Sequence, residues 1–335
     1  MSHTLIIAEA GVNHNGSLTT ALQLVNAAAD AGADIIKFQT FKAERLVSKD
    51  AQKAEYQKQN TADADTSQLA MLRKLELTAD DHLSLISHCA SRGIRFWSTA
   101  FDRESVDFLH SLKLGLWKIP SGEITNYPYI KQIASFHEPV IMSTGMCGED
   151  DVRAAMKVLA DNGVDKSMIT LLHCNTQYPT PMADVNLRAM LTLQRDFGVA
   201  VGYSDHTCGI EVPIAAVALG AQVIEKHFTL SRAMEGPDHK ASLEPHELKA
   251  MVAAIRNIEM ALGTGEKVVS PSERGNIAVA RKSIVAARAI KAGELLTDNN
   301  LTVKRPGTGM SPMLWPTVVG TRANRDYEPD EMIQL

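Results

Sequence analysis

Two stretches of the sequence each place a histidine at the end of an apolar run. Residues 200–209 read AVGYSDHTCG and lead to His206, while residues 221–230 read AQVIEKHFTL and lead through Glu225 to His227. Two neutral imidazoles from neighbouring strands can bind a divalent metal ion in an open site that water or a substrate oxygen completes. Hydrogen bonding at the rim of the fold is the alternative role. The occurrence of both histidines beside acidic residues favours the metal.

Two lysines, Lys37 and Lys118, stand among apolar residues in two further runs. Each could pair with a carboxylate such as Glu9 or Glu123. Each could instead hold a substrate phosphate or carboxylate, because lysine is a compact point charge that binds such groups. A lysine that forms a Schiff base is a third possibility, and it would make the protein an aldolase of another type. Two hydroxyl groups would assist the second role: Ser121 and Ser143.

Two carboxylates are candidates for proton handling. Glu9 ends the first apolar run and precedes the turn NHNG. A buried carboxylate at a strand end is costly unless it is paired or used, so Glu9 is a candidate for acid–base work or for binding a substrate hydroxyl. Asp238 lies in MEGPDHKASLEP (234–245), which is either a surface turn or a loop that carries Asp238 into the site.

Eight short apolar runs of strand type must position these groups, and each is followed by a stretch of helix length. Such alternation predicts a (β/α)8 barrel. A doubly wound sheet is the alternative, but no GxGxxG motif follows the first run. The runs are residues 4–11, 33–40, 94–99, 116–121, 139–144, 169–174, 199–206 and 222–228, and helices are expected in 18–33, 80–93 and 149–163 among others.

The ends of these runs carry reactive groups in every case. Because the carboxyl ends of barrel strands meet at one face, we expect the groups to converge on one polar pocket. They are Glu9; Lys37 and Gln39; Ser98 and Thr99; Lys118 and Ser121; Ser143 and Thr144; His173; Asp205 and His206; Glu225 and His227.

Composition limits the class of protein. The chain has 335 residues, 45% of them hydrophobic, which fits one large domain and a small one. With a net charge of −5 and no Lys/Arg run, nucleic acid is not an expected partner. The four cysteines form no CxxC pair and no export signal is evident, which predicts a cytoplasmic protein. The first apolar run is too short for a membrane span, so no membrane partner is expected.

The barrel pattern is expected to span residues 1–262, followed by a linker over 263–282 and a small domain over 283–335. So small a domain has little core of its own and is expected to dock on another surface. Its Arg305, in VKRPGTG, is either a solvated surface residue or a group that grips an anion or polar substrate atom. The long polar connection 42–72 has the length typical of an active-site lid.

The sequence resembles the bacterial sialic acid synthases, which make N-acetylneuraminate or its relatives from phosphoenolpyruvate. The resemblance covers nearly the whole chain. It rests on IIAEAGVNHNG, IKFQTFKAERLVS, KAEYQ, STAFDRESVDFL, WKIPSGEITNYPYIK, MSTGM, LLHCNTQYPTP, VGYSDHT, IEKHFTL, GPDHKASLEP, ARKSIVA and VKRPGTGMSP.

The resemblance implies a (β/α)8 barrel followed by an antifreeze-like (SAF) domain. It also implies a homodimer in which that domain covers the partner's barrel mouth. Asn175 is shifted by one position from the family's Asn-x-Tyr pattern, which puts an asparagine contact to phosphate in doubt. The implied roles are a divalent metal, Mn²⁺ or alternatively Mg²⁺ or another ion, on His206 and His227; phosphoenolpyruvate on Lys37, Lys118, Ser121, Ser143 and Thr99; the amino sugar on Glu9, Gln39, Glu123, Tyr178 and Asp238; and Arg305 reaching the N-acetyl group from the other subunit.

The expected function is therefore N-acetylneuraminate synthesis from phosphoenolpyruvate and open-chain N-acetylmannosamine, with C–C bond formation and phosphate release by C–O cleavage. Glu9 or Asp238 would position the water or the developing hydroxyl. The alternative is a legionaminic acid synthase, which performs the same chemistry on 2,4-diacetamido-2,4,6-trideoxymannose. A pseudaminic acid synthase, a Schiff-base aldolase and a non-catalytic sugar- or ice-binding protein are more distant alternatives.

Overall fold

The computed structural model describes residues 3–53, 57, 60 and 66–335. The chain divides into two compact units, residues 1–263 and 264–335, and each unit has its own hydrophobic core. We describe the two units separately. Among the described residues, no helix is both long enough and apolar enough to cross a membrane.

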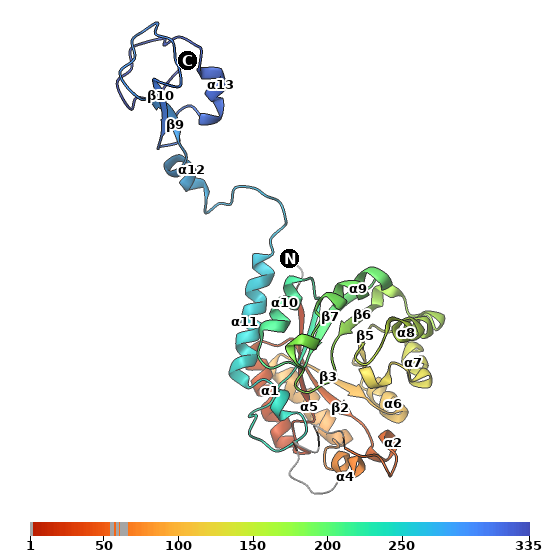
Figure 1. The fold of residues 1–335 in the computed structure, drawn as a ribbon. Coiled ribbons are helices and arrows are strands. Elements are labelled where there is room, and N and C mark those ends of the chain that lie inside the picture. The colour runs from red at the N-terminus through yellow and green to blue at the C-terminus, as the bar shows by residue number, and fades with distance from the viewer. Residues whose placement is uncertain (1–2, 54–56, 58–59, 61–65) are drawn as a thin grey trace. The chain divides into compact units, whose positions relative to one another are not determined.

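The first unit is a nearly closed barrel of eight parallel strands, as predicted (Figure 1). Hydrogen bonds join the strands in the order β3-β2-β1-β8-β7-β6-β5-β4, and the two end strands β3 and β4 are in contact. Each strand lies inside its predicted apolar run, except that β3 extends one residue beyond it. The strands are β1 (Leu5–Gly11), β2 (Ile35–Thr40), β3 (Arg95–Ala100), β4 (Trp117–Ile119), β5 (Val140–Ser143), β6 (Ile169–His173), β7 (Ala200–Asp205) and β8 (Val223–His227).

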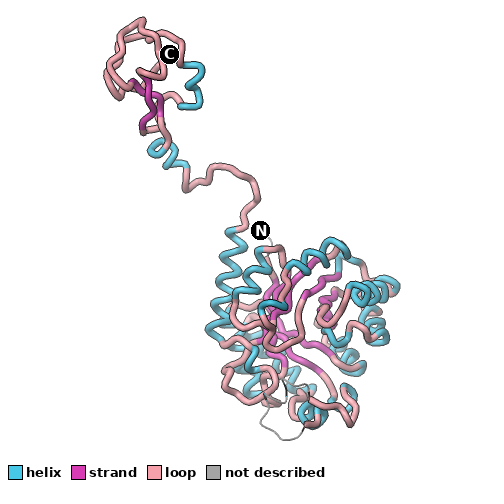
Figure 2. The backbone as a smooth tube through the Cα atoms, viewed as in Figure 1, coloured by secondary structure: helices cyan, strands magenta, loops and turns pink. Residues whose placement is uncertain are grey.

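Helices surround the strands (Figure 2). They pack against the outward side chains of the strands to form the large core. The three helices named from the sequence are found, and Gly32 ends the first of them at a φ of 82°, a left-handed conformation that favours glycine. The helices are α1 (Leu18–Ala31), α2 (Ala43–Leu46), α4 (Gln68–Arg73), α5 (Ala79–Arg92), α6 (Arg103–Ser111), α7 (Tyr127–Ala134), α8 (Glu149–Asp161), α9 (Arg188–Phe197), α10 (Glu211–Ala218) and α11 (Pro245–Ala261).

The inside of the barrel is filled by one inward side chain from nearly every strand. Successive side chains of a strand point to opposite faces, so one residue in two faces inward. In β7 the inward position is Gly202, where a Cβ atom would lie 2.3 Å from the Val223 carbonyl oxygen and 2.7 Å from Leu172. The layer consists of Ile7, Ile35, Trp97, Ile141, Leu172 and Val223, with Leu116 packed against it and Gly202 at the remaining position.

The long connection after β2 contributes α2 and α4 and a small apolar cluster near the carboxyl ends of the strands. Met71, Leu72 and Leu75 pack there with Val12 and Phe41. The predicted lid lies in this connection. Part of it, including Ala54, Glu55 and Tyr56 of the KAEYQ motif, lies outside the described residues.

The second unit has a compact core of its own. Its two antiparallel strands pair Ser283 with Lys304 and Ala286 with Leu301, and single bridges such as Ile290 to Tyr327 close the surrounding loops. The cis peptide bond before Pro306 lies just after the second strand. The elements are α12 (Arg274–Ala280), β9 (Ser283–Ala286), β10 (Leu301–Lys304), the 3-10 turn Pro312–Leu314 and α13 (Trp315–Val318).

Candidate active site

A complete ring of side chains, polar but for one thiol, lies above the apolar layer, one from each strand. Because side chains alternate, the residue two positions after each apolar-layer residue also points inward. All eight members of this ring line one cavity of about 510 Å³ at the carboxyl end of the barrel. They are Glu9, Lys37, Thr99, Lys118, Ser143, Cys174, Ser204 and Glu225.

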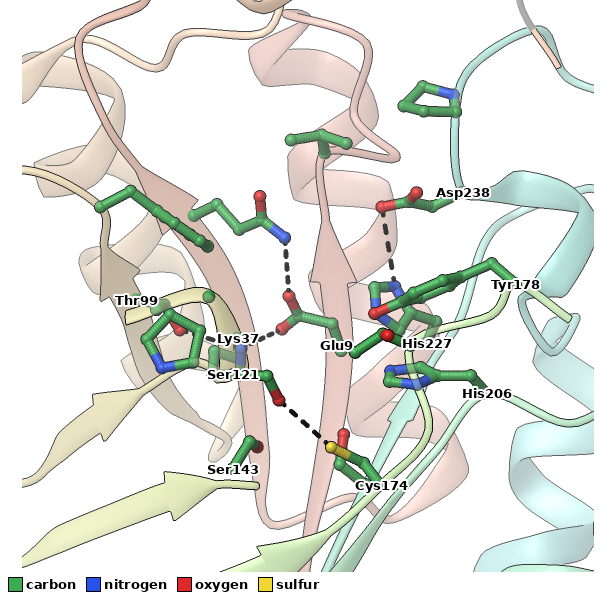
Figure 3. Close-up of a pocket in the computed structure, with 18 of the residues that line it drawn as sticks. Glu9, Lys37, Thr99, Ser121, Ser143, Cys174, Tyr178, His206, His227 and Asp238 are labelled. Carbon is green, nitrogen blue, oxygen red and sulfur yellow. Dashed lines mark hydrogen bonds and ion pairs between the residues drawn. The ribbon is translucent and has the colours of Figure 1, made fainter. Parts of the chain in front are cut away.

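The next inward positions bring three further predicted residues into the same cavity: Gln39, His206 and His227. Tyr178 and Asp238 reach it from loops after β6 and β8 (Figure 3). The Tyr178 ring lies against His206, with ring centroids 4.1 Å apart, and meets His227 edge-on at 5.6 Å. Apolar side chains of the connection after β2, among them Met71 and Leu75, line the cavity as well.

A network of two lysines and two carboxylates occupies the floor of the cavity. Glu225 accepts hydrogen bonds from Lys118 Nζ at 2.9 Å on both carboxylate oxygens and from the Ser204 hydroxyl at 3.1 Å. Its Oε2 also lies 3.7 Å from Lys37 Nζ. Lys37 forms an ion pair with Glu9 Oε2 at 2.7 Å and donates to the Thr99 hydroxyl at 2.9 Å. All four charged side chains are buried, so Glu225 acts as the shared counter-ion of both lysines.

The two carboxylates have different protonation properties. Burial raises the pKa of Glu9 to about 7; Lys37 opposes this effect and the neighbouring Glu225 adds to it. Burial also acts on Glu225, but Lys118 and Lys37 outweigh it and hold the pKa of Glu225 well below its usual range. Glu225 is therefore ionised at neutral pH, whereas Glu9 can take up or give away a proton there.

The hydroxyl of Ser121 lies at the edge of the cavity between two neighbours. It accepts a hydrogen bond from the Gly145 backbone N–H at 2.9 Å and lies 3.3 Å from Cys174 Sγ (Figure 3). Lys118 donates a hydrogen bond of 2.7 Å to the nearby Ser143 hydroxyl. This corner thus offers hydroxyl groups and an ammonium group to an anionic ligand.

The two histidines lie side by side at the mouth, with ring centroids 5.3 Å apart. His206 Nδ1 lies 2.5 Å from the Asn175 carbonyl oxygen. Because a carbonyl only accepts, Nδ1 carries the proton and Nε2 keeps a free lone pair. Burial lowers the pKa of His206 to about 4 and, together with His206 and Lys37, lowers the pKa of His227 well below its usual value. Both imidazoles are therefore neutral at physiological pH.

These two residues fit a divalent metal ion. The metal needs neutral imidazole, and within the described part of the chain His227 Nδ1 is a buried nitrogen without a hydrogen-bond partner. No group of three or more His, Cys, Asp or Glu side chains arranged for a metal occurs among the residues that the structure describes. The protein would thus supply two nitrogens and leave the other positions to water or substrate oxygen.

Asp238 lies beside this pair. One of its carboxylate oxygens lies 3.9 Å from His227 Nδ1, too far for a direct hydrogen bond. Burial raises the pKa of Asp238 to about 6. Of the two alternatives for residues 234–245, the structure therefore agrees with a loop that carries Asp238 into the site and not with a surface turn.

Two predicted site residues lie elsewhere. Glu123 is not among the residues that line the cavity, although Ser121 and Gly122 before it are, and its Oε2 accepts a hydrogen bond of 2.6 Å from Asn126. Glu123 is the last residue of the 3-10 turn Ser121–Glu123 that follows β4. Arg305 belongs to the second unit, where its Nε donates to the Ala280 carbonyl at 3.0 Å.

Four groups at the strand ends also point away from the cavity, which corrects the expectation that every one of them converges. Each immediately follows or precedes an inward residue and so faces the helices. His173, for example, lies with Nε2 3.0 Å from the Val185 carbonyl oxygen. The four are Ser98, Thr144, His173 and Asp205.

Glu225 was expected among the converging strand-end groups but was given no role in the site, whereas Ser204 and Cys174 are cavity residues that the sequence analysis did not predict. The signal for the first two was present, because Glu225 shares its strand face with His227 and Ser204 shares its face with His206. The apolar wall from α4 carried no such signal, since its sequence is far from any strand end.

Comparisons with known proteins show which families and relatives the sequence resembles. The sequence model of the NeuB family matches residues 24–267, and that of the SAF domain matches residues 281–335. The N,N′-diacetyllegionaminic acid synthase of Campylobacter jejuni is 53% identical over 334 residues, which is 100% of each chain. The enzyme of the same name from Legionella pneumophila is 50% identical over 95% of this chain and 89% of its own length.

A solved structure of a related protein has a similar fold. The N-acetylneuraminic acid synthetase of Leptospira borgpetersenii, crystallised with citrate, matches with a TM-score of 0.73 and 33% sequence identity. The match covers 82% of this chain and 90% of that chain.

Proposed function

Since the chain belongs to the NeuB family, we propose that it is an N,N′-diacetyllegionaminic acid synthase. It would join phosphoenolpyruvate to the open-chain aldehyde of 2,4-diacetamido-2,4,6-trideoxymannose and release phosphate. The observation that carries the proposal is the cavity floor, where two buried lysines share Glu225 directly below two neutral histidines.

Phosphoenolpyruvate fits the floor and the serine corner. It carries a phosphate and a carboxylate, and Lys37 and Lys118 provide two buried positive charges for them. Ser121 and Ser143 would donate their hydroxyl protons to its oxygens, and Thr99 beside Lys37 would border the same end. Glu225 keeps the two ammonium groups oriented before the substrate arrives, which lowers the cost of ordering them on binding.

The amino sugar fits above, between the histidines and the apolar wall. Glu9, Gln39, Tyr178 and Asp238 present polar atoms to its hydroxyl and amide groups. Val12, Met71 and Leu75 add apolar surface to the same lining. A 6-deoxy sugar with two acetyl groups has three methyl groups for such a surface, whereas N-acetylmannosamine has one. The wall and the 53% identity to the Campylobacter enzyme both support the diacetamido sugar over the N-acetylmannosamine expected first.

A divalent metal ion, Mn²⁺ by expectation, would be held by His206 and His227 and would polarise the sugar aldehyde as a Lewis acid. The remaining work falls to the chain itself. His206 is held in the ligand tautomer by the Asn175 carbonyl, and Tyr178 packs over its ring and keeps bulk water away from that side.

The bond changes follow from these positions. The C3 carbon of phosphoenolpyruvate attacks the aldehyde carbon, and positive charge develops at C2. Water adds at C2 and loses a proton to a nearby carboxylate, while the oxygen of the former aldehyde takes up a proton and becomes a hydroxyl. The C2 hydroxyl then loses its proton and becomes the ketone carbonyl as the C2–O bond breaks, and phosphate leaves with its bridging oxygen. Glu9 is placed for the proton of the water because its pKa of about 7 lets it accept the proton and return it at neutral pH. Asp238, beside His227, is placed for the developing sugar hydroxyl.

The family resemblance adds a homodimer to the proposal. In it, the second unit of one subunit would reach the barrel mouth of the other, and Arg305 would bind the N-acetyl group there. An arginine suits this role because its five N–H donors can bind an amide carbonyl from one side.

The experiment that tests the function measures phosphate release from phosphoenolpyruvate with Mn²⁺ and three sugars in parallel. The diacetamido sugar, N-acetylmannosamine and the pseudaminic acid precursor isomer form the panel, and mass spectrometry identifies the product. We expect kcat/KM for the diacetamido sugar to exceed that for N-acetylmannosamine at least tenfold. Equal or inverted preference would reject the diacetamido assignment, and silence with all three would reject the synthase assignment.

A further inference from the structure

A buried ion pair lies directly behind the two histidines, on the side of the barrel wall that faces the helices. Lys226 Nζ donates to Asp205 Oδ2 at 2.5 Å, and neither side chain has any exposed surface. The two residues are register partners of β7 and β8, the last hydrogen-bonded pair of positions before the strands deliver His206 and His227. The pair does not line the cavity, so it touches no substrate.

Thr207 also contacts this pair, and we call the three hydrogen-bonded residues the Asp205–Lys226–Thr207 knot. Its backbone N–H and its hydroxyl each donate to the Asp205 carboxylate at 3.0 Å, and its carbonyl accepts from Lys226 Nζ at 2.6 Å. Because Asp205 and Thr207 flank His206, these hydrogen bonds hold the backbone on both sides of that histidine. On β8 they hold Lys226, the residue just before His227.

Stability alone is a weak reason for such a pair. Taking two charges out of water costs several kcal/mol per ion, and apolar residues of similar volume often replace a buried ion pair without loss. A buried pair can instead specify one arrangement of the backbone among several. Here the arrangement it specifies is the separation of two neighbouring imidazoles, whose ring centroids lie 5.3 Å apart.

His227 needs this external support more than His206 does. The His206 ring is held by the Asn175 carbonyl. Within the described residues, Nδ1 of His227 has no hydrogen-bond partner. Its backbone is held by its carbonyl, which accepts from the Leu243 N–H at 2.9 Å, and by the strand position that Lys226 fixes.

We propose that the Asp205–Lys226–Thr207 knot is a positioning device that sets the two histidines at the spacing a divalent metal requires. The inference rests on the proposed metal role of His206 and His227. It extends that role to three residues that contact neither the metal nor the substrate. Groups that orient metal ligands in this way commonly change metal affinity by 10- to 100-fold when they are replaced.

The test compares Mn²⁺ binding in the wild type and in the double variant Asp205→Asn/Lys226→Met, by electron paramagnetic resonance of the unbound ion. Both substitutions keep the approximate shape and leave no buried charge unpaired. We expect the metal-free double variant to unfold near the wild-type temperature and its Kd for Mn²⁺ to rise at least about tenfold. A folded double variant whose Kd stays within twofold of the wild type would overturn the positioning role.

Three further variants show whether a change in Mn²⁺ affinity comes from the knot or from a general loss of stability. Leu159→Ala, in the buried face of α8 away from the site, should lower the unfolding temperature and leave Mn²⁺ affinity unchanged. Thr207→Val keeps both charges and should raise Kd a few-fold, which preserves the test if the double variant does not fold. His206→Ala should abolish binding. Wild-type protein that binds no Mn²⁺ would overturn the metal site itself, an outcome distinct from equal binding by wild type and double variant.

Discussion

Glu225 balances the charges of the cavity. It accepts from Lys118 with both oxygens, accepts from the Ser204 hydroxyl and lies near Lys37, so both oxygens of the carboxylate are engaged. A carboxylate with this many partners fixes two flexible side chains at once. We expect Glu225 to orient the two lysines and the lysines to bind the anionic substrate.

Replacing Glu225 by glutamine should separate the two lysines. The amide has the shape of the carboxylate, but its NH₂ group would face an ammonium group where an oxygen now accepts. We expect KM for phosphoenolpyruvate to rise at least tenfold and kcat to fall, together with a lower unfolding temperature because a buried pair is broken. Asp161→Asn, which alters the exposed pair with Lys157 on α8, should change neither constant. Wild-type constants in Glu225→Gln would refute the role.

The pH dependence of the reaction should report Glu9. A carboxyl with a pKa of about 7 is mostly protonated at pH 6 and mostly ionised at pH 8. If ionised Glu9 accepts the proton of the attacking water, kcat/KM rises with pH and levels off above about 7.

The Glu9→Gln variant provides the check on this assignment. It should lose turnover by about a hundredfold or more, and its residual rate should lack the rise near pH 7. Glutamine keeps the size of the side chain and can still accept from Gln39, so the barrel should remain folded. Full turnover in Glu9→Gln would remove Glu9 from the mechanism and leave Asp238 as the candidate.

At the scale of single residues, the sequence predicted which groups gather better than it predicted which way they point. Eleven of the thirteen predicted site residues line one cavity, and Glu123 and Arg305 do not. Adjacent residues of one strand, such as Ser98 and Thr99, were both predicted to face the pocket. Because side chains alternate along a strand, only one of the two can point inward. Glu225 was expected at the pocket without a role, and Ser204 could have been chosen by counting two residues back from His206. The role of each residue stays a prediction until variants are measured.

Among the elements, the strands were predictable because each is a short apolar run that ends in polar residues. The helices followed from their period, and the barrel followed from the alternation of the two. The contribution of α4 to the cavity could not be read in the same way. Its residues Met71 and Leu72 are apolar on one face, and only the folded connection shows that this face borders the site.

The glycine in β7 is an element-scale requirement. Gly202 occupies the apolar layer, where Leu172 and the Val223 backbone already fill the space. Gly202→Ala should lower the free energy of unfolding by about 1–3 kcal/mol, because a carbonyl oxygen at 2.3 Å cannot be displaced without moving β8.

Gly275→Ala is the matched control. It lies in α12, and nothing in the described structure comes within 4 Å of its added methyl group. Alanine there should leave stability unchanged or raise it by about 0.5–1 kcal/mol, since alanine favours helix. Chemical denaturation of both variants gives the comparison. Equal stability of Gly202→Ala and the wild type would mean that the interior of the barrel is less tightly packed than described.

At the scale of the whole molecule, the boundary between the two units lies at residues 263 and 264. The pattern change in the sequence predicted a barrel followed by a small domain, and the SAF match over residues 281–335 confirms the type of that domain. The choice between related sugars was beyond the sequence reasoning, because both groups share the motifs of the strand ends. It took full-length identity to two named synthases to favour the diacetamido sugar.

The proposed exchange of the second unit between subunits can be tested by complementation. Arg305→Ala leaves the barrel of its own subunit intact, and His206→Ala inactivates the barrel but leaves Arg305 intact. If each barrel receives Arg305 from its partner, mixed dimers regain one complete site, and refolding the two inactive proteins together should restore up to about a quarter of wild-type activity by random pairing. No recovery on mixing would place Arg305 at the barrel of its own subunit or at no site.

The most direct measurement uses phosphoenolpyruvate labelled with ¹⁸O in its bridging C–O–P oxygen, supplied with the diacetamido sugar and Mn²⁺. Attack by C3 followed by water addition at C2 leads to cleavage of the C–O bond, so we expect the label to leave in inorganic phosphate and no phosphate to form without the sugar. Label retained in the organic product, or phosphate released without any sugar, would contradict the synthase function that we propose from the cavity floor of Lys37, Lys118 and Glu225.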